Sequence, residues 1–308
     1  MDETDAMDDL PIIDAHHHLW DLERGPLYYP WLQDANPEPH FLGDQSELPR
    51  VFLPEDYRRA AAGHRVVGTV HVEAECSRTQ QVDETRWLTA LHAQYGMPNA
   101  IVAHAWVHTP NAEEILARQA AIPLVRGIRS KPVTRKSRTA SLPGVSGTMQ
   151  DPAWRKGLDL LRRFGLSWDL RVPTWHLEEA ATVVRENPDL AIVLNHTGFP
   201  WDRSPDGLAM WRAGMRALAA SPNCFCKLSC LCLLDGAWNY DDNRALVLET
   251  IELFGIDRCM FASNFPVDGV RISFAAMFDD FKRMTADFSY SDRRRLFHDN
   301  AARFYRLD

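Results

Sequence analysis

Short apolar segments recur along the chain, and each is followed by a stretch in which apolar residues repeat at helical spacing. This alternation predicts strand–helix units with parallel strands. The predicted strands are residues 12–16, 66–73, 100–107, 123–130, 166–172, 191–196, 223–229 and 258–263. Eight such units favour an α/β fold of the (β/α)8 barrel type over an open doubly wound sheet, because the first strand lacks the glycine-rich turn of a dinucleotide fold.

The helices predicted between these strands are residues 54–62, 82–95, 112–121, 152–164, 177–186, 208–220, 244–254 and 274–284. A last helix at 292–305 has no ninth strand before it, so we expect it to cover one side of the barrel. Two long connections, 21–53 and 131–150, are predicted to be lids over the barrel mouth. The whole chain, 1–308, is predicted to be one barrel domain, with residues 1–9 as a disordered tail.

Composition narrows the class of partner. The chain has 308 residues, 45% of them hydrophobic and 25% charged, with a net charge of -8 and a pI near 5.8. An acidic chain without a basic block gives no electrostatic reason to bind nucleic acid or an anionic membrane. The sequence shows no membrane span and no secretory signal, so we expect a cytoplasmic protein with a small-molecule substrate. A homo-oligomer is compatible with the sequence.

Four of the six cysteines, Cys224, Cys226, Cys230 and Cys232, lie within nine residues at alternating spacing. Zinc motifs usually show C-x2-C pairs, whereas this spacing is that of strand faces. We therefore interpret them as packed thiols, with a thiolate metal site as the alternative.

The first predicted strand ends in acidic and imidazole groups. Side chains alternate along an extended strand, so Asp14, His16 and His18 are expected on one face and His17 on the other. His16 and His18 can therefore converge on one metal ion or one substrate oxygen. The alternatives are histidines that are only packed and hydrogen-bonded, or remnants of a purification tag.

Glu73 ends the second strand. If Val70 and Val72 face the helices, Glu73 reaches the upper end of the barrel lumen, where it could act as a base, as a ligand or as a group that orients a histidine. The alternative is a buried ion pair with Arg129 or Lys227.

Cations and aromatic side chains are expected around the same rim. Arg129, Lys131 and Lys227 suit an anionic substrate, although such residues also neutralise barrel carboxylates. An aromatic mouth, with Trp20 and Trp175 as candidate substrate contacts, suits a substrate with an apolar or planar part. The other aromatic residues assigned to this mouth are Tyr28, Tyr29, Trp31, Phe41, Trp201, Trp238 and Tyr240.

The sixth and eighth strands repeat the pattern of an apolar run that ends in polar groups. His196 follows the sixth strand and makes a third imidazole on the rim, and three imidazoles can bind zinc or stabilise an oxyanion without metal. Asn264 is expected at the end of the eighth strand, with Asp268 four residues beyond it. Because an amide cannot accept a proton from water at neutral pH, a general base must be Asp268, Glu73 or His17.

These segments together resemble the amidohydrolase superfamily of metal-dependent (β/α)8 hydrolases, in particular its amidohydrolase-related ("amidohydrolase 2") branch of sugar-lactone and 2-pyrone-4,6-dicarboxylate lactonases. The segments that carry the resemblance are 14–20, 71–74, 126–129, 195–198 and 261–266. The resemblance implies that His16, His18 and His196 hold at most one divalent metal, zinc first, or act in a metal-free site. The family's strand-eight aspartate falls on Asn264, and Arg129 stands where other branches carry a residue that bridges two metals.

The resemblance implies hydrolysis of a lactone or similar cyclic ester, with His16, His18 and His196 polarising the carbonyl and a carboxylate activating water. A second interpretation is non-oxidative decarboxylation of an aromatic or unsaturated acid. A third is a catalytically silent binding barrel, in which Asn264 marks the loss of the water-activating group.

Overall fold

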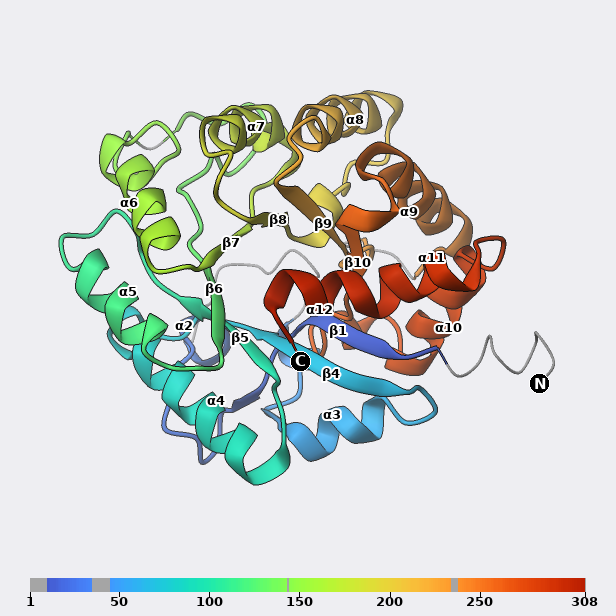
Figure 1. Ribbon diagram of the computed structural model, residues 1–308, viewed down its shortest axis with the longest axis horizontal. Coiled ribbons are helices and arrows are strands. Elements are labelled where there is room, and N and C mark those ends of the chain that lie inside the picture. The colour runs from blue at the N-terminus through green and yellow to red at the C-terminus, as the bar shows by residue number, and fades with distance from the viewer. Residues whose placement is uncertain (1–9, 35–44, 143, 234–237, 308) are drawn as a thin grey trace.

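The computed structural model describes residues 10–34, 45–142, 144–233 and 238–307. Eight parallel strands form one sheet in the order β1-β4-β5-β6-β7-β8-β9-β10, with the helices ranged around them (Figure 1). The strands are β1 (Ile12–His17), β4 (Val66–Val72), β5 (Ala100–His104), β6 (Val125–Arg129), β7 (Ser167–Leu170), β8 (Ile192–Leu194), β9 (Cys224–Leu228) and β10 (Cys259–Phe261). The predicted (β/α)8 barrel is confirmed.

The helices lie where the apolar periodicity predicted them. They are α3 (Pro54–Ala60), α4 (Gln81–Tyr95), α5 (Ala112–Ala120), α6 (Pro152–Arg163), α7 (Leu177–Glu186), α8 (Pro205–Ala219), α9 (Tyr240–Phe254) and α10 (Phe274–Met284). Helix α8 begins three residues earlier than predicted, because the Ser204 side chain accepts a hydrogen bond from the Gly207 amide. Helix α9 begins four residues earlier, because Asn239 caps it in the same way through the Asp242 amide.

The first long connection is tied down by elements that the sequence pattern did not predict. Strands β2 (Trp20–Asp21) and β3 (Val51–Phe52) pair in antiparallel fashion, and α2 (Pro30–Gln33) lies between them. Trp31 donates its indole N–H to the Ala74 carbonyl at 2.7 Å, which fixes the connection against the end of β4. The expected tail at 1–9 and the expected rim residue Phe41 lie outside the described residues.

The last predicted helix is built from α11 (Tyr290–Arg294), a π-helical segment (Arg295–Asp299) and α12 (Asn300–Tyr305). Phe304 and Tyr305 of α12 pack with strand residues in one buried cluster. The strand members of this cluster are Ile13, Ala15, Val70, Val72, Ala100, Val102, Val193, Met260 and Ala262. Helix α12 therefore covers one end of the barrel interior, beside β1 and β10 (Figure 1).

This cluster corrects the expected facing of β4. Val70 and Val72 point into the barrel interior with α12. Residues of other strands that face outwards, such as Ile101 of β5 and Phe261 of β10, pack in the larger cluster with the surrounding helices. His71 consequently faces away from the interior, where its ring lies 5.6 Å from that of His17. The expectation that Val70 and Val72 face the helices was wrong.

A register shift in β1 also breaks the expected alternation. The pairing of β1 with β4 is irregular between Asp14 and His17, where one extra residue is accommodated. Asp14 bonds to the Tyr57 hydroxyl of α3 at 2.7 Å, and the ring of His17 lies 4.8 Å from that of Tyr57. Asp14 therefore lies on the side of His17 and not, as expected, on the side of His16 and His18.

The seam between the first and last barrel strands is joined by Asp14 and by the segment after β10. The Asp14 carboxylate accepts hydrogen bonds from the Ser263 amide at 2.8 Å and from the Ser263 hydroxyl at 2.6 Å. The Asn264 amide donates to the His16 carbonyl at 2.8 Å, and the His18 amide donates to the Phe265 carbonyl at 2.7 Å. The strand that carries the histidine pair is thus tied directly to the segment that carries Asn264.

All six cysteines are buried free thiols. Cys224 and Cys226 pack in the larger apolar cluster, as strand residues facing helices do. None of the helices in the described ranges is both long and apolar enough to cross a membrane.

Candidate active site

Three histidine rings meet at the carboxyl ends of β1 and β8. The ring of His16 lies 5.0 Å from that of His18 and 4.5 Å from that of His196. All three side chains are buried, and His17 lies on the opposite side of β1. The structure therefore brings together the three histidines singled out in the sequence, although 178 positions separate His18 from His196.

Hydrogen bonds fix two of the rings and leave nitrogens of all three available. His18 bonds through Nδ1 to the Val72 carbonyl at 2.7 Å, so this nitrogen carries the proton. His196 bonds through Nδ1 to the Ser229 hydroxyl at 3.1 Å. Neither ring nitrogen of His16 has a hydrogen-bond partner within the described part of the chain. Buried polar atoms without a hydrogen-bond partner point to a ligand or to a catalytic role.

The backbone around His196 is strained. His196 has φ of 61° and Thr197 φ of 53°, a left-handed conformation that costs free energy in residues with a Cβ. The turn is held because the Thr197 hydroxyl donates to the Ser229 carbonyl at 3.2 Å and the Trp211 indole donates to the Thr197 carbonyl at 2.8 Å. These contacts aim the imidazole of His196 at that of His16.

Burial keeps the three imidazoles neutral. It lowers the pKa of His18 to about 3 and, with smaller contributions from nearby cations, holds the pKa of His16 and His196 well below the ordinary value. Lys227 is the foremost of these cations for His16, and Arg171 for His196. Neutral imidazoles can offer a lone pair to a metal ion or an N–H to a developing oxyanion.

The three imidazoles are ligands of a type that can bind one divalent ion. Three neutral imidazoles suit zinc, and the free nitrogens of His16 supply an unsatisfied buried donor. Within the described ranges, however, no three side chains of histidine, cysteine, aspartate or glutamate are already placed as a metal-holding group. Metal binding therefore requires the rings to turn towards a common point.

Asn264 is bonded through its backbone N–H to the His16 carbonyl, and its side chain contacts Asp268. Asn264 lies three residues beyond the end of β10 with φ of 55°, and its side-chain amide donates to Asp268 Oδ1 at 2.8 Å. Asp268 is fully buried, and its Oδ2 has no hydrogen-bond partner in the described ranges. Burial raises the pKa of Asp268 to about 7, so this carboxyl can both accept and release a proton near neutral pH.

Glu73 forms a buried ion pair with Arg129, which was the alternative to a role as base or ligand. Its Oε1 lies 2.5 Å from Nε of Arg129, and His104 Nδ1 lies 3.7 Å from its Oε2. Burial raises the pKa of Glu73, but Arg129, His104 and Lys131 together outweigh burial and leave this pKa below its ordinary value. Glu73 is therefore held as a charged partner of Arg129.

The other two predicted cations are also paired with carboxylates. Lys131 contacts Glu75, and Lys227 Nζ lies 2.6 Å from Asp169 Oδ2 with both side chains fully buried. Tyr305 of α12 also donates to Asp169, at 3.1 Å. These contacts are those of the alternative role, in which the cations neutralise barrel carboxylates.

The two tryptophans proposed as substrate contacts differ in accessibility. Trp20 is fully buried beneath the first long connection, with its indole donating to the Pro49 carbonyl at 2.8 Å. Trp175 is partly buried and donates to the Arg135 carbonyl at 3.1 Å, in the second long connection. Of the two, Trp175 is the one that reaches the surface.

The sequence interpretation missed Arg171, Asp169, Ser229 and Tyr305. Arg171 directly follows β7 and carries the same signal as the residues that were found, a polar group at the end of an apolar run. Asp169 and Ser229 gave no such signal within their strands. The approach of Tyr305 to Asp169 joins residues 136 positions apart and follows only from the docking of α12.

Glu84 provides a test of the buried electrostatics near the site. It is 1% exposed and accepts a hydrogen bond from the Ala74 amide at 3.0 Å, and burial raises its pKa from 4.5 to about 8. Because the folded protein keeps this proton when the unfolded chain loses it, the free energy of unfolding falls as pH rises between these values, by up to about 1.4 kcal/mol per pH unit. We expect Glu84→Gln to reduce that slope in urea unfolding between pH 5 and 9, and to be more stable than wild type above pH 8.

The exposed α9 residue Glu252 gives the matched control, since Glu252→Gln should leave the slope as in wild type. Asp268, with its raised pKa, adds a slope of the same sign below pH 7 in every variant. Equal slopes in Glu84→Gln and wild type above pH 7 would contradict a protonated Glu84.

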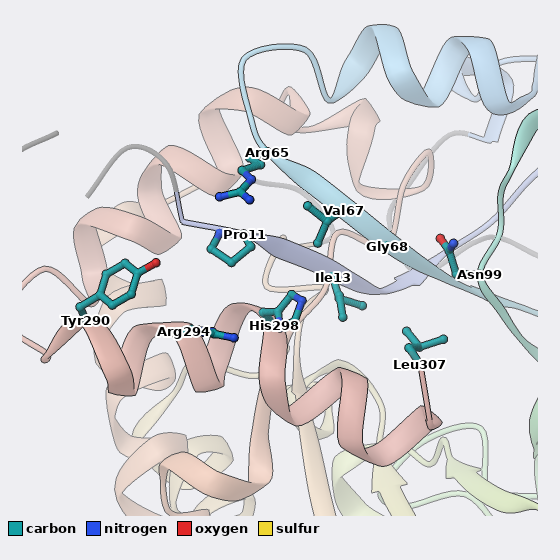
Figure 2. Close-up of a pocket in the computed structure, with 10 residues that line it drawn as sticks. All are labelled: Pro11, Ile13, Arg65, Val67, Gly68, Asn99, Tyr290, Arg294, His298 and Leu307. Atoms are coloured by element: carbon teal, nitrogen blue, oxygen red, sulfur yellow. The ribbon is translucent and has the colours of Figure 1, made fainter. Parts of the chain in front are cut away.

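A hollow of about 470 Å³ lies at the end of the strands opposite the histidines, between the starts of β1 and β4 and the C-terminal helices (Figure 2). Arg65, Arg294 and His298 are among its lining residues, but Asp299 bonds to both Arg294 and His298. None of the predicted site residues lines this hollow.

Comparison with known proteins gives matches over almost the whole chain. The family model described as "Amidohydrolase" matches residues 13–307. The chain is 39% identical over 301 residues to the uncharacterized protein y4mH of Sinorhizobium fredii, covering 98% of this chain and all of that one. It is 28% identical over 311 residues to an L-fucono-1,5-lactonase of Burkholderia ambifaria, covering 96% of each. A crystal structure of an amidohydrolase from Burkholderia multivorans with bound zinc superposes with a TM-score of 0.79 at 24% identity, covering 96% of this chain and 99% of that one.

Proposed function

The chain belongs to the amidohydrolase family, and from that premise we propose that it is a hydrolase that opens a lactone or a similar cyclic ester. The resemblance to lactonases at 28% identity supports this choice of substrate class. The observation that carries the proposal is that three neutral histidines adjoin the segment after β10, in which Asn264 holds the buried carboxyl group of Asp268, of pKa about 7.

In the proposed reaction, the imidazoles of His16 and His196 donate an N–H to the negative charge that develops on the lactone carbonyl oxygen. His18 carries its proton on Nδ1, so its Nε2 would act on that oxygen only through a bound metal ion. Asp268 in its charged form takes a proton from water as the water oxygen bonds to the carbonyl carbon. The tetrahedral intermediate then collapses, the ring C–O bond breaks, and the proton held by Asp268 passes to the departing alkoxide. Asn264 keeps the Asp268 carboxyl in place through its side-chain amide.

We propose that a divalent ion, zinc first, would be held by His16, His18 and His196. When bound, it would supply Lewis acidity at the carbonyl oxygen. Zinc bound by a neighbouring amidohydrolase structure supports this proposal, and the free nitrogens of His16 are its basis in this chain.

Hydrolysis can be tested with a pH-indicator screen over sugar lactones and other cyclic esters, because ring opening releases a proton. Turnover of at least one lactone class is the expected result, and it would also exclude a catalytically silent barrel. If carbon dioxide is released from an aromatic acid and no lactone is opened, the decarboxylase interpretation replaces this proposal.

We expect the purified protein to hold no more than one divalent ion per chain, since Asn264 and Arg129 stand where an anionic ligand and a metal bridge would be needed. Elemental analysis of the purified protein measures this directly, and two ions per chain would contradict it. Activity lost on chelation and restored by zinc would assign carbonyl activation to the metal. Full activity in the stripped protein would assign it to the imidazoles alone.

A further inference from the structure

We infer that Ser229 is a positioning residue whose hydroxyl lets His196 take either of two roles, as an N–H donor to the substrate carbonyl oxygen or as a lone-pair ligand of a divalent ion. Ser229 directly follows β9 and is fully buried. Its hydroxyl lies 3.1 Å from Nδ1 of His196, whose ring lies 4.5 Å from that of His16. The inference rests on the proposed lactone hydrolysis and names the residue that would set the role of one of its reacting groups.

The bonding partners of His18 and His196 differ in kind. His18 Nδ1 lies 2.7 Å from the Val72 carbonyl oxygen, which can only accept, so the proton of this ring is fixed on Nδ1. The Ser229 hydroxyl beside His196 can either donate or accept. His196 can therefore carry its proton on either nitrogen and keep this hydrogen bond, whereas His18 cannot.

Each arrangement of the Ser229 hydroxyl matches one role of His196. When the hydroxyl donates to Nδ1, the proton of the neutral ring is on Nε2, which can then donate to the carbonyl oxygen. When the hydroxyl rotates and accepts from Nδ1–H, Nε2 offers its lone pair to a metal ion. Between the two arrangements one proton leaves Nε2 and one joins Nδ1, so the ring stays neutral and the number of bound protons is unchanged.

The hydroxyl of Ser229 can be removed without touching the bonds that hold the turn at Thr197. The Ser229 amide donates to the Thr197 hydroxyl at 3.3 Å, and the Ser229 carbonyl accepts from that hydroxyl at 3.2 Å. Both of these are backbone groups. Among the described residues, the Ser229 side chain has its hydrogen bond to His196 alone. Ser229→Ala therefore removes the contact with His196 and leaves the bonds to Thr197 in place.

The direct test is the position of the His196 proton, read by nitrogen NMR of protein with isotope-labelled histidines, in which His196→Asn identifies the signals of that ring. In the metal-free protein we expect the proton on Nε2. With zinc bound we expect it on Nδ1, while His18 keeps its proton on Nδ1 in both states. A His196 proton on Nδ1 in the metal-free protein, or one that stays on Nε2 with zinc bound at the histidines, would overturn the inference.

Ser229→Ala should weaken zinc binding by about 10- to 100-fold, the usual cost of removing a partner that orients a metal-binding histidine. In the metal-free protein it should lower kcat by roughly tenfold with KM unchanged, because the oriented N–H acts on the transition state. Ser229→Thr keeps a hydroxyl and should restore most of both losses. The inference does not survive if Ser229→Ala keeps the zinc affinity and the kcat of wild type.

Ser167→Ala is the matched control. Ser167 is a buried serine at the first position of β7, away from the carboxyl ends of the strands, and its hydroxyl donates to the Arg126 carbonyl at 3.3 Å. Its loss removes a buried hydroxyl of the same kind without reaching the histidines. Zinc affinity and kcat of Ser167→Ala should therefore equal those of wild type, and equal losses in both alanine variants would show a general effect of stability and overturn the inference.

Failure of this inference and failure of the proposed function give different results. If the His196 proton changes nitrogen on zinc binding in a protein that opens no lactone, the role of Ser229 stands and the reaction does not. If lactones are opened while the His196 proton stays on one nitrogen with and without zinc, the reaction stands and the role of Ser229 does not. If no zinc binds, the inference of two roles is overturned.

Discussion

Replacing His196 by alanine is expected to lower kcat/KM for the lactone by roughly a hundredfold to a thousandfold, the cost of losing one group that stabilises a developing oxyanion. His196 is the member of the cluster supplied by β8, and it lies 4.5 Å, ring to ring, from His16. Without it, His16 would be the remaining imidazole of the proposed pair that donates an N–H to the carbonyl oxygen, because His18 carries its proton on Nδ1. Initial rates at saturating and limiting substrate measure the effect.

The fold should survive this substitution, and a second variant guards against local collapse. His196 has φ of 61°, so alanine is strained there, whereas asparagine tolerates the left-handed conformation better. His196→Asn should lose activity to a similar degree with a wild-type unfolding transition. His298→Ala, at the opposite end of the barrel, is the matched control and should retain full activity. Wild-type turnover in both His196 variants would remove the histidine cluster from the mechanism.

Asp268→Asn is expected to abolish the acid limb of the pH profile, which is the fall of kcat/KM at low pH. It should also lower kcat/KM by roughly 10²- to 10⁴-fold. A base must be ionised to accept a proton, so wild-type kcat/KM should fall as pH drops through about 7, the raised pKa of Asp268. His18, with a pKa of about 3, remains neutral throughout this range and does not produce that limb. The measurement is kcat/KM from pH 5 to 9.

Glu73→Gln provides the comparison for the alternative base. It leaves Arg129 buried without its carboxylate, so the free energy of unfolding should fall by about 3–5 kcal/mol. The Glu73→Gln protein that remains folded should still show the fall of kcat/KM as pH drops through about 7. If Glu73→Gln loses that limb and Asp268→Asn keeps it, Glu73 takes the role of base. If both keep it, His17 becomes the residue to replace next.

The barrel could be predicted from the sequence because its signal is repeated eight times. Buried parallel strands are apolar on both faces, and this makes them recognisable without knowing which face is which. The same property explains the wrong facing of Val70 and Val72, since either face of β4 is apolar enough for the interior. Helix starts at Ser204 and Asn239 were placed late because their polar caps precede the apolar pattern by several residues.

The histidine cluster could be predicted because parallel strands bring their carboxyl ends to one rim. The position of Asp14 could not, because a single extra residue in β1 turns it towards Tyr57, and such an irregularity leaves no mark in the sequence. The pairing of Lys227 with Asp169, and the approach of Tyr305, depend on how α12 docks. Contacts of this kind follow from tertiary packing and not from local pattern.

The seam between β1 and the segment after β10 couples the folding kinetics to the chemistry. Asp14 and Ser263 are 249 positions apart, and contacts between such distant residues form late because the chain between them must already be ordered. His16 and Asn264 bond to one another across the same seam. We therefore expect barrel closure and assembly of the proposed catalytic groups to be one event. During refolding, the return of activity should follow the slowest phase, after helical circular dichroism has recovered.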